Sequence, residues 1–325
     1  MASLGKWLEK DCLGHRKATR CGASEHVAKP TSNSTEDITE QYTYDANAFR
    51  DSVIDGRGNP TQLCFEVDDA GAAISGSHSN LTRVISPPPS GGANPLVTLY
   101  QHGGKHNLVQ SIPPKGVGNG STVTCSTDLS GVIDSDYATD LAYDAATATK
   151  LESVTRRYTD LDLGALTAVT KFEYGDSSNP GLVTKVIPPR GNTGGSPDYT
   201  YATTFAYFGS GPKAGLLQSV TDPLGNETTY DYDAAGRRTS MVDPNGNAAG
   251  GIPTDHTWST EYEAEDRVRF VHAPAPVAGG SELTTEFRYD PVGNRTVVID
   301  ANGQVTKYLY DERDSLAEVQ QSPSV

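Results

Sequence analysis

Residues 217–247 read LQSVTDPLGNETTYDYDAAGRRTSMVDPNGN and contain one short unit twice. The turn sequence DPLGN at 222–226 recurs 21 residues later as DPNGN at 243–247. Between the two turns, Thr and Tyr at 228, 230 and 232 alternate with Thr and Asp at 229, 231 and 233, which is the two-residue period of a β-strand. A glycine turn at Gly236 then leads into a second alternating run, 238–242. The unit therefore predicts one β-hairpin per period, with two short strands and two tight turns.

The same unit lies over other parts of the chain at fixed offsets, which distinguishes a repeat from a chance likeness. The segment 289–303 matches 232–246, which lies 57 residues earlier, and 310–311 follows 21 residues after 289–290. Near the start of the chain, 42–45 and 53–59 fit the same frame. The residues predicted to define the repeat, all in structural roles, are Tyr44, Asp45, Tyr230, Tyr232, Asp233, Gly236, Arg237, Asp243, Gly246, Tyr289, Asp290, Gly293, Asp300, Gly303, Tyr310 and Asp311.

The middle of the chain is more degenerate, but a hairpin skeleton persists there. In 98–114, 171–189 and 204–223, an aromatic strand is followed by a turn of variable length, a second β-branched strand and a proline. We interpret the variable spacing as loop insertions, and predict an all-β chain built as an array of antiparallel β-hairpins. Ten aromatic residues mark the candidate units: Tyr44, Phe65, Tyr100, Tyr143, Tyr174, Tyr207, Tyr232, Tyr262, Tyr289 and Tyr310.

The pattern Tyr-Asp-x-x-Gly-Arg, followed by Asp-x-x-Gly and then Tyr, resembles the YD repeat of the Rhs family. The match is closest at 232–247 and 289–311. That family includes bacterial polymorphic toxins, shell-forming subunits of insecticidal toxin complexes and teneurin cell-surface proteins. The resemblance implies a curved or spiralling β-ribbon, here a partial shell, whose partner is the rest of a larger Rhs-type shell or other copies of the chain. The Asp-Pro pairs at 222 and 243 are repeat turns, so the terminal self-cleavage of toxin members is not carried over to them.

Composition favours the same class. Only 35% of residues are hydrophobic, while Gly (33) and Pro (20) are frequent, which suits short strands and tight turns better than a helical core. The net charge of −15 disfavours binding to nucleic acid or to an anionic membrane, because both need clustered Lys and Arg. No stretch reaches the roughly 20 apolar residues of a transmembrane helix. We expect a secreted or cell-surface chain without a recognisable signal peptide, without membrane insertion and without nucleic-acid partners.

Two segments are predicted from the distribution of the repeat. Residues 1–40 lack it and form an irregular leader with a short helix at 6–20, whereas 41–325 form the hairpin array with its insertions. The four cysteines are too few for a disulfide framework, so we expect buried free thiols. The leader also holds a cluster whose spacing departs from common zinc sites, so no metal is assigned to it. Its members are Cys12, His15, Cys21 and His26.

Candidate chemistry is sparse. His102 and His106 lack a third ligand nearby, and the Asp-x-Asn-Gly turns lack the further acids of a calcium loop. No nucleophile elbow, P-loop or dinucleotide fingerprint is present. We therefore predict a non-catalytic structural segment without cofactors, a shell or scaffold for toxin delivery or cell-surface presentation. The alternative is a surface module that binds carbohydrate or a cell-surface protein through its tyrosine rows and loops.

Overall fold

The computed structural model describes residues 27–29, 38–44, 50–55, 57–65, 80–88, 94–118, 123–160, 162–277 and 280–322. The chain divides into two compact units, Met1–Val169 (unit 1) and Thr170–Val325 (unit 2), and the division falls within strand β10 (Gly164–Glu173). The predicted helix at 6–20, the Cys/His cluster of the leader and Asp45 lie outside the described residues. A short strand, Val27–Lys29, occurs within the predicted leader, and the boundary at residue 40 stays a prediction.

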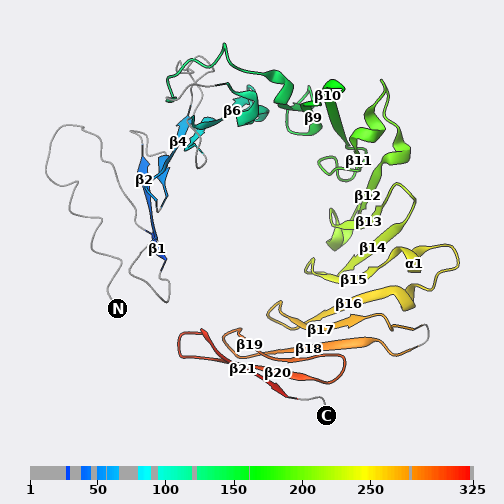
Figure 1. The fold of residues 1–325 in the computed structure, drawn as a ribbon. Coiled ribbons are helices and arrows are strands. Elements are labelled where there is room, and N and C mark those ends of the chain that lie inside the picture. The colour runs from blue at the N-terminus through cyan, green and yellow to red at the C-terminus, as the bar shows by residue number, and fades with distance from the viewer. Residues whose placement is uncertain are drawn as a thin grey trace. The chain divides into compact units, whose positions relative to one another are not determined.

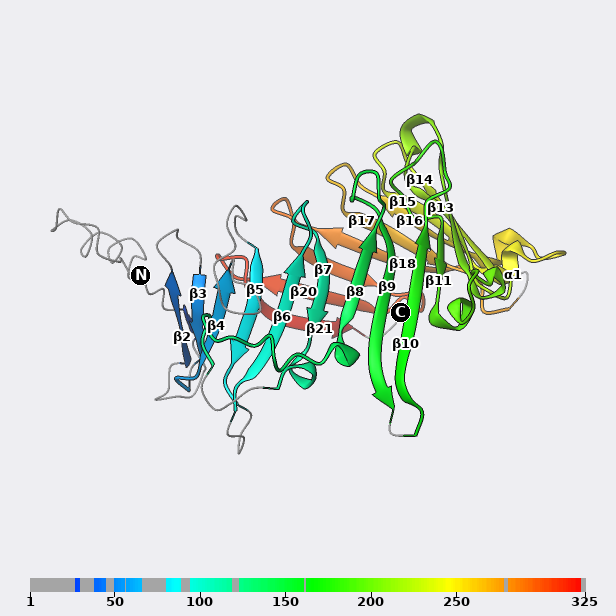
Figure 2. The ribbon, with the colours of Figure 1, turned by 90° about the horizontal axis from the view of Figure 1, so that it is seen from above.

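Unit 1 is an antiparallel meander in which each strand pairs with the next along the chain, as Figure 2 shows for β2 to β9. Two one-turn 3-10 helices, η1 (Pro114–Gly116) and η2 (Ser135–Tyr137), lie between β7 and β8. The strands are β1 (Val27–Lys29), β2 (Ile38–Tyr44), β3 (Arg50–Ile54), β4 (Pro60–Phe65), β5 (Leu81–Ser86), β6 (Leu96–His102), β7 (Leu108–Ile112), β8 (Thr139–Tyr143) and β9 (Leu151–Asp160).

Unit 2 continues the same pattern, with every strand from β11 onward paired antiparallel with its neighbour in sequence (Figure 1). The strands are β11 (Lys185–Ile187), β12 (Thr203–Tyr207), β13 (Leu217–Thr221), β14 (Glu227–Tyr232), β15 (Arg238–Val242), β16 (Thr257–Tyr262), β17 (Val268–Ala273), β18 (Leu283–Tyr289), β19 (Arg295–Ile299), β20 (Val305–Tyr310) and β21 (Leu316–Ser322). Short helices interrupt it at η3 (Pro189–Asn192), η4 (Tyr199–Tyr201), η5 (Gly211–Lys213), α1 (Pro244–Asn247) and η6 (Pro253–His256). The prediction of an all-β array of antiparallel hairpins is confirmed.

Unit 1 buries one face of its sheet beneath an insertion. Cross-strand pairing aligns Cys64, Arg83, Leu99 and Ile112 on one face of β4 to β7. The insertion between β7 and β8 covers this row and completes the core with Val117, Val123, Leu129 and Ala138, all of them buried. Since each fully buried aliphatic side chain stabilises the fold by about 1.5–3 kcal/mol, the insertion supplies a second layer that the hairpins alone do not have.

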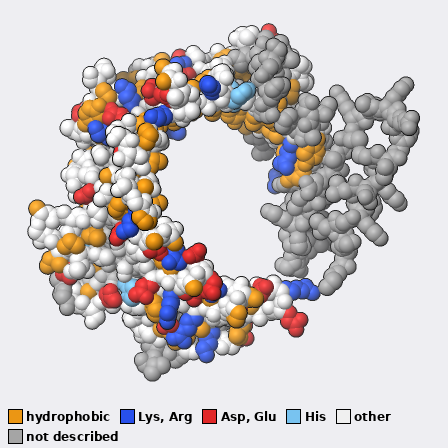
Figure 3. Space-filling view, turned by 180° about the vertical axis from the view of Figure 1, so that it is seen from behind, with side chains coloured by type: hydrophobic (Ala, Val, Ile, Leu, Met, Phe, Trp, Pro, Cys, Tyr) orange, Lys and Arg blue, Asp and Glu red, His pale blue; other side chains and the backbone are white. Residues whose placement is uncertain are grey.

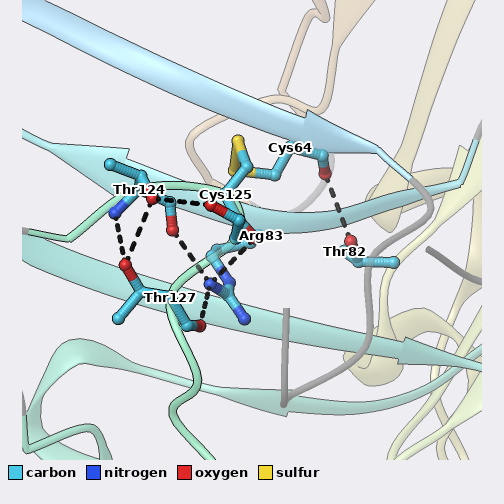
Figure 4. The surroundings of a disulfide bond; sticks show 7 residues. Cys64, Thr82, Arg83, Thr124, Cys125 and Thr127 are labelled. Carbon is cyan, nitrogen blue, oxygen red and sulfur yellow. Dashed lines mark hydrogen bonds between the residues drawn. A yellow bond between two sulfur atoms is a disulfide. The ribbon is translucent and has the colours of Figure 1, made fainter. Parts of the chain in front are cut away.

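A disulfide bond fixes this cover to the sheet. Cys64 of β4 is bonded to Cys125 of the insertion, and the two are 61 residues apart in sequence (Figure 4). The expectation of free thiols at these two positions is wrong. The cysteine count argued against a dense framework, but only the crossing of the insertion over β4 brings these two sulfur atoms together. A loop of this length is closed at an entropic cost, and a disulfide across it stabilises the folded state by about 4 kcal/mol.

Arg83, directly opposite Cys64 in the ladder, is the largest fully buried side chain and is 1% exposed. Its Nη1 atom donates hydrogen bonds to the carbonyl oxygens of Thr124, Cys125 and Thr127, at 3.1, 3.2 and 2.8 Å. A buried cation is costly unless hydrogen-bonded, so these carbonyls make its burial tolerable. Arg83 therefore shapes the path of the chain on both sides of Cys125.

Unit 2 has no comparable cover among its described residues. Only Ile187, Ala202 and Ser219 are buried there as side chains. One face of its strands carries the aromatic and aliphatic side chains that the alternation predicts, such as Tyr230 opposite Met241 and Met241 opposite Trp258, and these are partly buried. Unit 2 must therefore draw much of its stability from contacts between neighbouring hairpins.

Candidate functional site

The repeat tyrosines occupy one equivalent position in the ladder. Tyr44, Tyr232, Tyr289 and Tyr310 each end a strand, pair with the first residue of the following strand, and are preceded by a one-residue shift of register. Such a shift is a β-bulge, which bends the strand and redirects a side chain. Tyr230 lies two residues before Tyr232 and shares its face of β14. The same position is held by Phe65, Tyr143, Tyr207 and Tyr262.

Two of the ten aromatic markers do not hold this position. Tyr100 lies inside β6, and His102 takes the bulged position two residues later. Tyr174 follows the last residue of β10. A search for aromatic residues cannot distinguish two positions on the same face of a strand, and the bulge that separates them is a property of the pairing.

The repeat aspartates begin a five-residue turn of constant geometry. The carboxylate of Asp233 accepts hydrogen bonds from the N–H groups of Ala235 and Arg237, at 2.9 and 3.0 Å, and Gly236 adopts a φ of 82°. Turns of this form need a left-handed residue at the fourth position, which glycine adopts without strain. Asp55, Asp222, Asp290, Asp300 and Asp311 accept the same pair of bonds. Gly293 and Gly303 hold the fourth position after Asp290 and Asp300, whereas Asp314 holds it after Asp311.

Hydrogen bonding favours the ionised form of the turn carboxylates of Asp222, Asp233 and Asp290. The side-chain amide and backbone N–H of Asn226 lower the pKa of Asp222 from its ordinary value. For Asp233 and Asp290, partial burial opposes the shift, but the donors from Arg237 and Asn294 still leave the pKa lowered. The turns are therefore built for pH values at which the aspartates are charged.

The turn predicted at 243–247 differs from the others. Asp243 accepts bonds from the N–H groups of Asn245 and Gly246, and the chain then forms the one-turn helix α1 in place of a hairpin turn. A Cβ atom on Gly246 would lie 2.6 Å from His256 Cβ and 2.7 Å from Val242 Cγ1. Gly246 is thus required by close packing, whereas Gly236 is required by its backbone angle.

Two insertions contain the same pair of sequence motifs, and a main-chain hydrogen bond joins the two motifs in each. We call this linkage the brace. Only its prolines were part of the predicted hairpin pattern. Ile-Pro-Pro precedes a basic residue and a glycine at 112–116 and again at 187–191, and Asp-x-x-Tyr-Ala-Thr follows at 134–139 and 198–203. In both, the N–H of the aspartate donates to the glycine carbonyl at 2.8 Å. A Cβ on Gly116 or Gly191 would lie within 2.8 Å of the preceding isoleucine Cγ2. The brace anchors η1 to η2 and η3 to η4.

A column of turn side chains ties each hairpin of unit 2 to the next from β14 onward. The Arg237 guanidinium donates from Nε to Asp233 at 2.6 Å, and from Nη1 to the Glu263 carbonyl at 3.3 Å and the Asp266 carboxylate at 2.7 Å. Arg267, one hairpin later, repeats the arrangement by contacting Glu263 and donating to the Asp290 carbonyl at 3.3 Å. We name this set, Asp233, Arg237, Glu263, Arg267, Asp290 and Asn294, the turn column.

The turn column continues with a neutral residue, Asn294, and other ion pairs lie beside the column. Asn294 occupies the arginine position in the next turn and donates to Asp290 at 3.1 Å and to Asp314 at 2.9 Å. Around it, Figure 3 shows acidic and basic side chains interleaved over the later strands of unit 2, where Arg288 also pairs with Glu286. Opposite charges in alternation neutralise one another locally, so this edge is not a binding surface for one sign of charge.

The tyrosines join the same linkage. Tyr262, Tyr289 and Tyr310 donate their hydroxyl hydrogens to the carbonyls of Arg238, Val268 and Arg295, at 2.9, 2.9 and 3.0 Å. Each acceptor is the first residue of the return strand one hairpin earlier. The guanidiniums of Arg237 and Arg267 lie over the rings of Tyr262 and Tyr289, with 4.7 and 4.9 Å to the centroids. Cation–π contacts of this kind add about 0.5–1 kcal/mol at exposed sites.

The arrangement of these side chains links neighbouring strands to one another. Within the described ranges, no group of three or more His, Cys, Asp or Glu side chains is placed to hold a metal ion. No helix among those residues is long and apolar enough to cross a membrane. His102 and His106, the two imidazoles singled out from the sequence, lie at the β6–β7 hairpin, where burial and His106 together lower the pKa of His102.

Comparison with known families agrees with this geometry. The family model described as RHS Repeat matches residues 213–248 and 289–322, which contain the first and last turns of the turn column. These two segments of the chain are RHS repeats. The matched RHS segments include all of the predicted repeat-defining residues from Tyr230 to Asp311, and none of those in unit 1. No curated protein matches the chain in sequence.

Two solved structures show a likeness to this chain at low sequence identity. One is the structure of Photorhabdus luminescens Tc holotoxin pore with the mutation TccC3-D651A, at 15% identity and a TM-score of 0.37, covering 90% of this chain and 15% of that chain. Another is the crystal structure of TcdB2-TccC3-Cdc42, at 15% identity and a TM-score of 0.27, covering 87% of this chain and 19% of that one. The chain spans less than a fifth of the length of these structures.

Proposed function

We propose that this RHS-repeat chain is a non-catalytic structural segment, a scaffold for toxin delivery or cell-surface presentation. The turn column is the observation that carries the proposal. The column repeats with the hairpin. Its charged groups bond to one another and to main-chain carbonyls, and these bonds hold neighbouring hairpins in register. A chain built this way supports a surface by repetition, since each unit is stabilised mainly by its neighbours.

The partner we propose is the rest of a larger Rhs-type shell or further copies of the chain. Strand β21 supports this, because all seven of its residues are exposed and its described pairing is with β20 alone. An exposed strand edge presents unpaired N–H and C=O groups to another strand. We also propose a secreted or cell-surface location, and the Cys64–Cys125 disulfide supports an oxidising compartment.

The second candidate, binding of carbohydrate or protein through the tyrosine rows, gains no support from their contacts. The hydroxyls of Tyr262, Tyr289 and Tyr310 are bonded to neighbouring carbonyls, and arginines lie over the rings of Tyr262 and Tyr289. These groups serve packing between hairpins.

Edge-to-edge association tests the proposal. Sedimentation velocity of the purified chain should show concentration-dependent association that Val319→Lys in β21 abolishes, because an edge lysine opposes strand pairing. Val292→Lys is the matched control, since Val292 is more exposed (73% against 48%) but lies in a turn. A chain that stays monomeric at all concentrations would contradict assembly of copies through β21, and one that turns over ester, glycoside or peptide substrates in a way that a single substitution abolishes would contradict the scaffold role.

A further inference from the structure

One face of unit 1 changes from apolar to polar along a single row of paired residues. Cross-strand pairing places Thr43, Ser52, Gln62, Ile85 and Val97 next to one another on β2 to β6. Val97 and Ile85 are 0% and 6% exposed and belong to the core beneath the insertion. Thr43, Ser52 and Gln62 are only partly buried. The described cover therefore protects the apolar end of the row and leaves the polar end accessible.

The polar end forms the floor of a cavity of about 610 Å³. This volume lies within the roughly 300–1,000 Å³ typical of small-molecule sites. Val123, the edge of the insertion, closes one side, and prolines line the walls. Because the proline ring fixes φ, these walls are largely preformed. The wall prolines are Pro60, Pro87, Pro88 and Pro95.

The lining groups define the chemistry of a ligand. The Thr43 hydroxyl hydrogen-bonds to the Asp51 carboxylate and lies 2.6 Å from the Ser52 hydroxyl oxygen. Gln62 adds an amide that can both donate and accept. No Lys or Arg lines the cavity, so a phosphate, a sulfate or a nucleic acid would meet one carboxylate and no counter-charge. The ligand should carry groups that donate and accept at once.

We propose that this cavity binds a neutral carbohydrate. Sugar hydroxyls both donate and accept, which matches a floor of two hydroxyls, an amide and a carboxylate. Neighbouring strands lie about 4.8 Å apart, so Thr43, Ser52 and Gln62 offer hydrogen-bonding groups at regular intervals across the floor. A cationic side chain would use only acceptors and leave the donors of Gln62 unpaired, which is unfavourable in a confined site. The site is separate from the tyrosine rows, and the scaffold role does not depend on it.

The test screens the full-length chain on a printed array of neutral, sialylated and sulfated oligosaccharides, with a lysine-rich peptide as a further arm. Positive neutral glycans are then titrated by calorimetry. Gln62→Leu and Ser52→Val should each weaken binding at least tenfold, because each removes hydrogen-bonding groups from the floor. Ser240→Val in β15 is the matched control and should leave the affinity unchanged. Hydrogen exchange of the wild-type chain should show glycan-dependent protection within 50–65 and 80–88, a readout independent of variant folding.

Several outcomes would overturn the inference. They are the absence of any neutral glycan that binds, binding that survives both cavity variants, protection that appears only in unit 2, and binding of the peptide or of sulfated glycans alone. Substrate turnover that a single substitution abolishes would refute the scaffold proposal and leave this one standing, so the two fail separately.

Discussion

Units 1 and 2 are made of the same hairpins but are stabilised differently. In unit 1, an insertion, a disulfide and a buried arginine place a second layer on one face of the sheet. In unit 2, three described side chains are buried, and stability depends on the turn column, the tyrosine hydroxyls and the brace between η3 and η4. The difference shows that one repeat can be stabilised by a covering layer or by its own neighbours.

The largest effect expected is loss of the disulfide. Cys64→Ser should lower the free energy of unfolding by about 2–5 kcal/mol, because the unfolded chain regains the entropy of a long open loop. Hydrogen exchange should show the lost protection in unit 1 peptides around 81–112 and 123–138. The control, Cys12→Ser with Cys21→Ser, removes the other two cysteines and should change neither the free energy of unfolding nor the exchange protection of unit 1. Equal loss of protection throughout unit 2 would refute the separation between the units.

Replacement of Arg83 tests the cover without touching the disulfide. Arg83→Met keeps most of the apolar stem but removes the donor shared by three carbonyls of the insertion. We expect destabilisation of about 3 kcal/mol, since buried acceptors lose their partner. Chemical unfolding followed by exchange at 123–138 measures it. A variant as stable as the wild type would show that the carbonyls are satisfied without the guanidinium.

A single added methyl group at Gly191 should destabilise the brace of unit 2. Gly191→Ala would place a Cβ 2.7 Å from Ile187 Cγ2 and 2.8 Å from the Asp198 carbonyl oxygen. The resulting overpacking should cost about 1–3 kcal/mol in thermal unfolding. Gly194→Ala is the control, because its added Cβ would meet nothing within 4 Å. Equal melting temperatures for the two variants would show that the brace accommodates the added methyl group without loss of stability.

A smaller effect is expected for a tyrosine of the linkage between hairpins. Tyr289→Phe removes the hydrogen bond to the Val268 carbonyl and should destabilise unit 2 by about 0.5–1.5 kcal/mol. Tyr158→Phe, at a residue that is 44% exposed, is the comparison and should be neutral. Denaturant unfolding with exchange at 262–299 distinguishes local loosening from a global change.

The smallest effect expected per residue is the loss of folding stability at acid pH, and it occurs in both units. The lowered pKa values of Asp55 and Asp222 mean that their turns stabilise the fold fully above the unfolded pKa near 3.8 and lose this contribution as pH falls through the folded values. Stability should decline below about pH 4, and Asp222→Asn should flatten part of that decline. An Asp222→Asn profile parallel to the wild type would argue against these turns as its source.

Some features of this fold could be predicted from the sequence, and others could not. The strands and the Asp-x-x-Gly turns were predictable, because alternation, glycine and aspartate report local backbone geometry, whereas the bulge beside each repeat tyrosine is a property of the strand pairing. The column itself was not, since Arg237 and Glu263 meet only when two hairpins pair. The braces were visible as a repeated Ile-Pro-Pro motif, but their partners lie up to 22 residues downstream at Asp134, across an insertion of variable length.

The amino-acid sequence by itself determined an all-β array of hairpins joined by tight turns, because these follow from preferences that act over a few residues. Tertiary structure alone decided that Cys64 meets Cys125, that Arg83 is buried, and that the polar row from Thr43 to Gln62 lines a cavity. Each of these depends on how an insertion crosses the sheet, and no local preference encodes that path.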